Sequence, residues 1–224
     1  MKLYYHPAST VSRPVMLFAA EAQVPLEMQV VDLFTGEQTQ PAYDAVNPSH
    51  LVPVLEDGNF RLTESSAILK YLAEKAGSPL YPRDLQARAR VNERMDWVNT
   101  QLCRELAYGF VYPQIFPNHK RRSDEAQAAT LQWGQERAQT WLKLLDEHVL
   151  GPGNNYVCGD MITIADHFCA AFVALAETTG GNFAAYPNVN RWLGRMKALK
   201  SWQPSYQAIE GFAASLKGQP MQTV

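Results

Sequence analysis

In the N-terminal part of the chain, short apolar segments alternate with polar turns. The spacing of the apolar positions changes between that typical of strands and that typical of helices. Residues 2–6 predict a strand, and a helix is predicted from position 11 or 12 to Ala22. A second strand is predicted over residues 26–32, where Met28 and its apolar neighbours alternate with polar residues. Residues 34–45 are polar and marked by glycine and proline, which predicts a loop with at most a short helix.

Residues 47–69 combine several structural signals in one stretch. Val52–Leu55 predicts a strand with Pro53 near its head, and Asp57-Gly58 is a strong hairpin signal before a second strand. A helix then follows Thr63, with apolar residues at helical spacing. The order strand, helix, strand, loop, strand, strand, helix is that of a thioredoxin-like domain.

The proline of this stretch also indicates a binding surface. A proline at a strand edge opens a position in the hydrogen-bond ladder, and a cis peptide bond there holds a tight turn. The free backbone groups would then lie beside the start of the next helix. Such a pairing suits a peptide-like ligand that carries a carboxylate.

The rest of the chain predicts helices only, after a break at residues 77–82. We therefore expect a first domain at 1–78, a linker at 79–86 and an all-helical domain at 87–224. Thr163 and Asp166 have the spacing of a capping box, which indicates a role in folding. The tail from Lys217 is expected to be frayed. Helices are predicted over residues 85–109, 123–149, 163–178, 189–199 and 206–216.

Composition and charge narrow the class of protein. The formal net charge is −2, so nothing favours nucleic acid or an anionic membrane as a partner. The start of the chain has no apolar signal-peptide region, and the longest apolar run, residues 168–176, is too short to span a membrane. Three separated cysteines form neither a disulfide framework nor a metal cluster. We expect a cytoplasmic protein without a metal.

Three linked motifs in residues 47–69, V-P-x-L, the D-G hairpin and E-S-x-A-I-L, resemble the glutathione-binding half of the glutathione transferases. YPRDLQARARVNERMDW at 81–97 looks like the first helix of the theta-class helical domain. GDMITIAD at 159–166 and YPNVNRWLGRMKAL at 186–199 are similar to later family segments. The chain resembles a theta-like or delta-like bacterial member. This implies an α/β thioredoxin-like domain plus an all-α domain, glutathione as co-substrate and a homodimer.

The chemistry that this resemblance implies is activation of a thiol. Lowering a thiol pKa from about 8.5 to about 6.5 requires roughly 2.7 kcal/mol in favour of the thiolate. One hydrogen bond to a charged group supplies about 1.5–3 kcal/mol, and a helix N-terminus adds about 0.3–1 kcal/mol. A single hydroxyl at the start of the first helix is therefore enough.

Four hydroxyls compete for this role. Ser9 is favoured because S-T-V-S-R matches the theta and delta pattern S-x-x-[C/S]-R, while Tyr5 lies where tyrosine-type enzymes keep their phenol. Thr10 falls where beta-type enzymes have a cysteine, and Ser12 replaces a cysteine often found before the arginine. Alternatively the serines only cap the helix, which is the better reading for Ser12. Arg13 either adds positive potential near the sulfur or forms a structural ion pair.

The resemblance also implies the residues that hold glutathione. Glu64 would pair with the α-amino group and Ser65 would bind the carboxylate of the γ-glutamyl end, the alternative being a simple helix cap. The backbone of Val52, beside Pro53, would pair with the cysteinyl part like a strand.

Three further positions concern the other end of the tripeptide. His50 matches the delta-type position that meets the glycine carboxylate, although a lone histidine is more often structural. Gln38 stands where theta enzymes tend to have a histidine. Asn99 would reach glutathione across a dimer interface.

The electrophile would bind where the second domain faces Ser9. Tyr108, Phe110, Tyr112 and Phe116 follow the first long helix and are candidates for an apolar pocket, with core packing as the alternative for each. We therefore expect a glutathione transferase that acts on small electrophiles. The alternatives are a glutathione-dependent disulfide or peroxide reductase, and a non-catalytic scaffold with the same fold.

Overall fold

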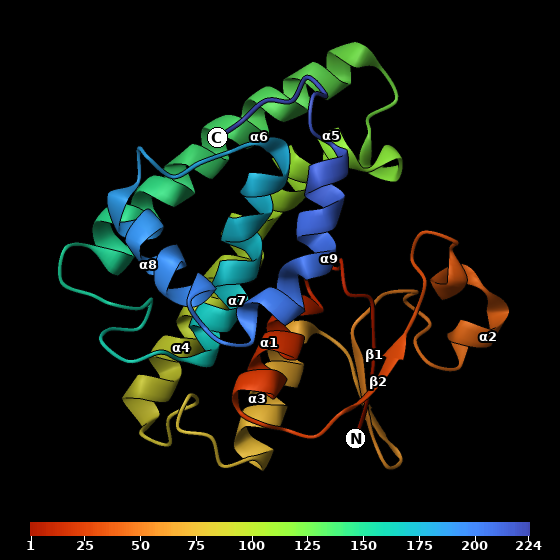
Figure 1. The fold of residues 1–224 in the computed structure, drawn as a ribbon, viewed down its shortest axis with the longest axis vertical. Helices are drawn as coiled ribbons and strands as arrows, with labels where there is room; N and C mark the ends of the chain where they lie inside the picture. Colours follow the sequence, from red (N-terminus) through yellow and green to blue (C-terminus); the bar gives the residue numbers. More distant parts are fainter.

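The computed structural model describes all 224 residues and consists of a mixed four-stranded sheet with its helices, followed by a helical domain (Figure 1). The strand order is β2-β1-β3-β4, with β1 and β2 parallel and the other neighbours antiparallel. This arrangement confirms the predicted fold class. The strands are β1 (Lys2–Tyr5), β2 (Glu27–Val30), β3 (Val54–Asp57) and β4 (Phe60–Leu62).

Helices α1 (Arg13–Glu21) and α3 (Ser65–Lys75) pack between the sheet and the helical domain (Figure 1). Their apolar faces bury Leu3 and Leu55 of the central strands completely. The short helix α2 (Pro41–Asp44) and the one-turn 3₁₀ helix Glu37–Thr39 lie on the side away from the helical domain. The predicted loop with a short helix is therefore confirmed.

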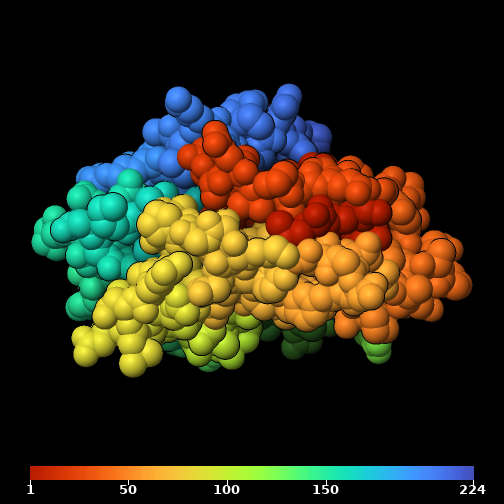
Figure 2. Space-filling view, turned by 90° about the horizontal axis from the view of Figure 1, so that it is seen from below, coloured from red at the N-terminus to blue at the C-terminus, as the bar shows by residue number.

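The helical domain is built around α7, whose ten residues are all buried. A helix that is apolar nearly all round has to be covered on every side, which explains the central place of α7. Figure 2 shows the N-terminal residues gathered on one side of the molecule and the later helices on the other. The helices are α4 (Leu85–Trp97), extended by a π-helical segment (Val98–Val111) and α5 (Tyr112–Ile115), then α6 (Asp124–Leu144), α7 (Ile164–Val173), α8 (Pro187–Lys197) and α9 (Trp202–Ser215).

Asp166 organises the start of α7, as the predicted capping box indicated. Its carboxylate accepts from the Thr163 N–H at 2.8 Å and the Val157 N–H at 2.8 Å. It also accepts from the indole N–H of Trp192 at 2.9 Å. Burial raises the pKa of this carboxyl to about 6 against the opposing effect of these donors. The group is completely buried and belongs to folding, not to catalysis.

The predicted second strand is present as β2, although it is shorter at both ends, and it lies open at the sheet edge, where Met28 is 42% exposed. Two expectations about local structure are wrong. The hairpin turn is one residue later than predicted, because Asp57 still pairs with Phe60. The tail is not frayed: Gln222 exchanges hydrogen bonds with Gln114.

No helix has the length and apolar content that crossing a membrane requires.

Candidate active site

The loop before β3 presents free main-chain groups. The Val52–Pro53 peptide bond is cis. The N–H and C=O of Val52 take part in none of the backbone hydrogen bonds formed outside the helices and strands. The preceding carbonyl of Leu51, by contrast, accepts from Asn47 Nδ2 at 2.9 Å and from the Tyr43 hydroxyl at 3.0 Å. Val52 can therefore pair with an extended peptide.

The start of α3 has no capping side chain. Its N-cap residue, Glu64, has a φ of 63° and forms no side-chain cap, although such a positive φ is strained for a residue with a Cβ. The starts of α4 and α6 are capped by the side chains of Asp84 and Ser123. Unpaired N–H groups at a helix start favour a bound anion. Ser65, the first residue of α3, is 6% exposed.

Ser9 lies in the turn between β1 and α1. Its Oγ accepts a hydrogen bond from the N–H of Ser12 at 3.3 Å, and its own N–H donates to the carbonyl of His6 at 3.0 Å. Because the hydroxyl acts here as an acceptor, its hydrogen remains available for donation to another group. Ser9 thus stabilises the turn and still has a proton to offer.

The competing hydroxyls differ in exposure. Ser12 is completely buried, its Oγ has no partner, and its side chain does not cap α1, so the capping role expected for Ser12 is wrong. Thr10 is only 5% exposed. Tyr5 is partly exposed, like Ser9, and packs against the main core. Exposure therefore favours Ser9 and Tyr5 over the other two.

Arg13 points into the boundary between the two domains. Its guanidinium is completely buried against the ring of Tyr206 at 4.9 Å and donates to the carbonyl of Ala171 at 3.4 Å. Burial lowers the pKa of this group, and Glu210 opposes that effect from a distance. No carboxylate forms an ion pair with Arg13, so the expected structural ion pair is absent. Arg13 makes a cation–π contact with Tyr206 in its place.

Five aromatic residues contact one another in a continuous row, which we call the aromatic wall. It begins at Phe34, whose ring lies 6.2 Å from that of Phe212 on α9. Phe212 stacks on Phe116 at 5.7 Å, and Phe116 lies 5.3 Å from Tyr112. Tyr112 meets Tyr108 at 5.0 Å. The wall joins the N-terminal domain, through Phe34, to the helical domain, through Phe212.

Sequence reasoning found part of this wall. Phe110, a further candidate, is completely buried and belongs to the core. Phe34 and Phe212 were missed. The only sequence signal for Phe34 is that an aromatic residue stands in an otherwise polar loop. In the structure its side chain is 65% exposed. Phe212 continues the apolar spacing of Tyr206 and Ile209 and gives no separate signal.

Comparison with known proteins identifies the family. A model of the glutathione S-transferase N-terminal domain matches residues 8–75, and a model of the C-terminal domain matches residues 109–200. Glutathione S-transferase theta-1 of Homo sapiens is 35% identical over 205 residues, covering 88% of this chain and 82% of that protein. This chain belongs to the glutathione S-transferase family. The mouse theta-1 enzyme is similar at 34% identity over the same coverage.

Solved structures of glutathione S-transferases share this fold over most of the chain. Human T1-1 in its apo form has a TM-score of 0.80 at 33% identity and covers 93% of this chain and 88% of its own. Human theta-2, in complex with glutathione and an unknown ligand, has a TM-score of 0.84 at 28% identity, with coverages of 99% and 92%. The predicted family membership is therefore confirmed for this transferase.

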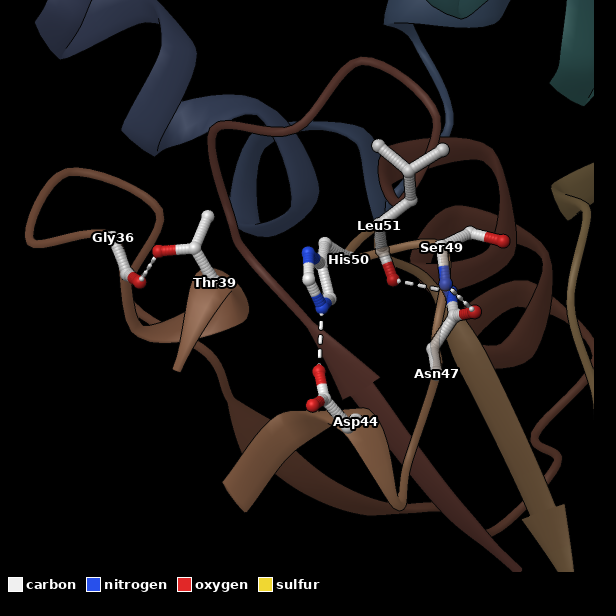
Figure 3. Close-up of polar contacts among 7 residues, drawn as sticks. All are labelled: Gly36, Thr39, Asp44, Asn47, Ser49, His50 and Leu51. Atoms are coloured by element: carbon white, nitrogen blue, oxygen red, sulfur yellow. Dashed lines mark hydrogen bonds and ion pairs between the residues drawn. The ribbon is translucent and has the colours of Figure 1, made fainter. Parts of the chain in front are cut away.

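The residues predicted to bind the glycine end of glutathione lie on three different segments of this transferase. His50 Nε2 lies 2.5 Å from Asp44 Oδ1, and His50 has a φ of 57°. Figure 3 shows the ring of His50 turned toward this carboxylate. Gln38 has a buried Oε1 without a partner. Asn99 is exposed on the π-helical segment. The roles of these residues in glutathione binding stay predictions.

Proposed function

We propose that this glutathione S-transferase binds glutathione between Val52 and the start of α3, and that Ser9 stabilises the thiolate. The observations that carry the proposal are the uncapped start of α3 and the unpaired backbone of Val52. The γ-glutamyl carboxylate fits the free N–H groups at Ser65 and Ser66. Glu64 forms no ion pair within the chain, so its carboxylate can bind the α-amino group.

Ser9 supplies the thiolate stabilisation in this proposal. Its hydroxyl already accepts the Ser12 N–H, which favours donation of its own proton to a sulfur anion. A hydrogen bond to a charged group stabilises it by about 1.5–3 kcal/mol, which corresponds to a thiol pKa lowered by roughly 1–2 units. The buried charge of Arg13, four residues along, adds positive potential to the same turn.

The aromatic wall supports an apolar acceptor. Tyr108 is 46% exposed and Phe116 is partly exposed, while Tyr112 packs against both rings and is only 8% exposed. Burial raises the pKa of Tyr108, and Glu64 adds a smaller effect in the same direction. A planar apolar electrophile would stack on this surface while the thiolate attacks it. The proposed reaction is addition to, or substitution of, such an electrophile.

The decisive experiment compares Ser9→Ala with Tyr5→Phe in kcat/KM for glutathione and a chlorinated aromatic acceptor at pH 6.5. We expect Ser9→Ala to lower kcat/KM by about 10- to 100-fold, because it removes about 1.5–3 kcal/mol of thiolate stabilisation. Tyr5→Phe should stay within a factor of two. Loss of activity in Tyr5→Phe with full activity in Ser9→Ala would refute the assignment of Ser9.

The same proteins separate the alternative functions. A scaffold protein would pass through immobilised glutathione without retention, whereas the proposed enzyme would be retained. A reductase would turn over a disulfide or peroxide faster than the chlorinated acceptor. We further propose a cytoplasmic location, which the three free thiols favour, and a homodimer in which the exposed Asn99 faces the partner. The division at residues 79–86 remains a prediction.

A further inference from the structure

His50 is held by a rigid turn that follows α2. The His50 N–H donates to the Asn47 carbonyl at 3.0 Å, and the side-chain oxygen of Asn47 accepts the Ser49 N–H at 3.0 Å. Asn47 is only 3% exposed, and its Nδ2 donates to the Leu51 carbonyl at 2.9 Å (Figure 3). These bonds hold His50 at a φ of 57°, a strained backbone of the kind that persists at binding sites.

The ring of His50 has one occupied nitrogen and one free nitrogen. Nε2 lies 2.5 Å from Asp44 Oδ1, at the end of α2, whereas Nδ1 forms no hydrogen bond within the chain. The His50 side chain is 41% exposed, so a ligand can reach it. Because Asp44 accepts from Nε2–H, the orientation of the ring is fixed and Nδ1 is turned away from that carboxylate.

We infer that Asp44 is a positioning residue that prepares His50 to bind the glycine carboxylate of glutathione. A neutral ring with its proton on Nε2 would present only a lone pair at Nδ1, which repels a carboxylate. A ring protonated on both nitrogens donates from Nε2 to Asp44 and from Nδ1 to the glycine carboxylate. The Asp44 carboxylate, 2.5 Å from Nε2, holds the ring so that Nδ1 faces away from Asp44 and toward a ligand. The inference rests on the proposed binding of glutathione beside Val52.

The test measures kcat and KM for glutathione in the wild type, Asp44→Asn, His50→Gln and the double variant. γ-Glutamylcysteine, which lacks the glycine, serves as a second thiol substrate. We expect Asp44→Asn to raise KM for glutathione by about 3- to 10-fold with kcat unchanged, because one charge-assisted contact is weakened. With γ-glutamylcysteine the variant should match the wild type. The double variant should be no worse than His50→Gln, since both changes act through one contact.

Asp124→Asn is the matched control, because it removes the same charge from a fully exposed carboxylate on α6. It should leave both KM values unchanged. An unchanged KM for glutathione in Asp44→Asn, or an equal rise for both thiols, would overturn the inference. If His50→Gln also leaves KM unchanged, the glycine end binds elsewhere and the inference fails with it. The assignment of Ser9 stands or falls separately, in the Ser9→Ala comparison.

Discussion

Replacing Gly134 with alanine tests how closely α6 approaches the π-helical segment. A Cβ on Gly134 would lie 2.5 Å from the carbonyl carbon of Gly109 and 3.0 Å from the backbone nitrogen of Phe110. Ordinary contacts begin near 3.4 Å, so the two backbones would have to separate by roughly 1 Å. A gap of this size forfeits a quarter to a half of the dispersion energy at each contact across the interface. We therefore expect a net destabilisation of about 1–3 kcal/mol, even though alanine is the better helix former by about 1 kcal/mol.

Thermal unfolding followed by far-UV circular dichroism measures this effect. A loss of about 2 kcal/mol lowers Tm by roughly 4–8 °C in a protein of this size. Gly194→Ala and Gly211→Ala are matched controls, because both glycines lie in helices and a Cβ there meets nothing within 4 Å. These controls should raise Tm by about 1–4 °C through helix propensity alone. If Gly134→Ala also raised Tm, the backbones would not be in close contact and the reasoning would be refuted.

Two further predictions concern a buried histidine and the C-terminal tail. His167 is completely buried with an unpartnered Nε2, and burial lowers its pKa, so only the unfolded chain gains a proton as pH falls below about 6.5. His167→Leu should flatten the loss of stability between pH 6.5 and 5 in urea titrations; an unchanged slope would assign that loss to other groups. Ending the chain after Gly218 removes the bonds of the tail to Gln114 and Gln135, and should cost about 2 kcal/mol of unfolding free energy. An unchanged midpoint would show that the tail is frayed in solution.

The features that could be predicted from the sequence are those fixed by neighbouring residues. The order of strands and helices follows from local apolar spacing, and the capping box at Thr163 needs only a residue three positions away. The helix start at Ser65 and the proline before β3 were found for the same reason, because each motif is continuous in the chain. The family resemblance rested on the same continuous motifs and was confirmed.

The features that the sequence could not reveal depend on contacts between distant segments. Met28 alternates like a buried strand residue, but no later element covers the edge that it occupies. Phe34 and Phe212 meet only because α9 crosses back over the N-terminal domain. The pair of Asp44 and His50 depends on a turn whose backbone has a positive φ, a conformation that histidine rarely adopts.

The burial of Arg13 ties the two domains into one cooperative unit. The side chain of Arg13 extends from α1, and its guanidinium lies between the Ala171 carbonyl and the ring of Tyr206. The ring of Tyr206 in turn stacks on that of Trp202 at 3.6 Å. One hydrophobic cluster of 45 buried residues draws on both domains around this contact. Separating the domains would bring an unsolvated cation and two apolar helix faces into water together. Denaturation should therefore proceed in a single transition, and neither half of the chain would keep its shape when expressed alone.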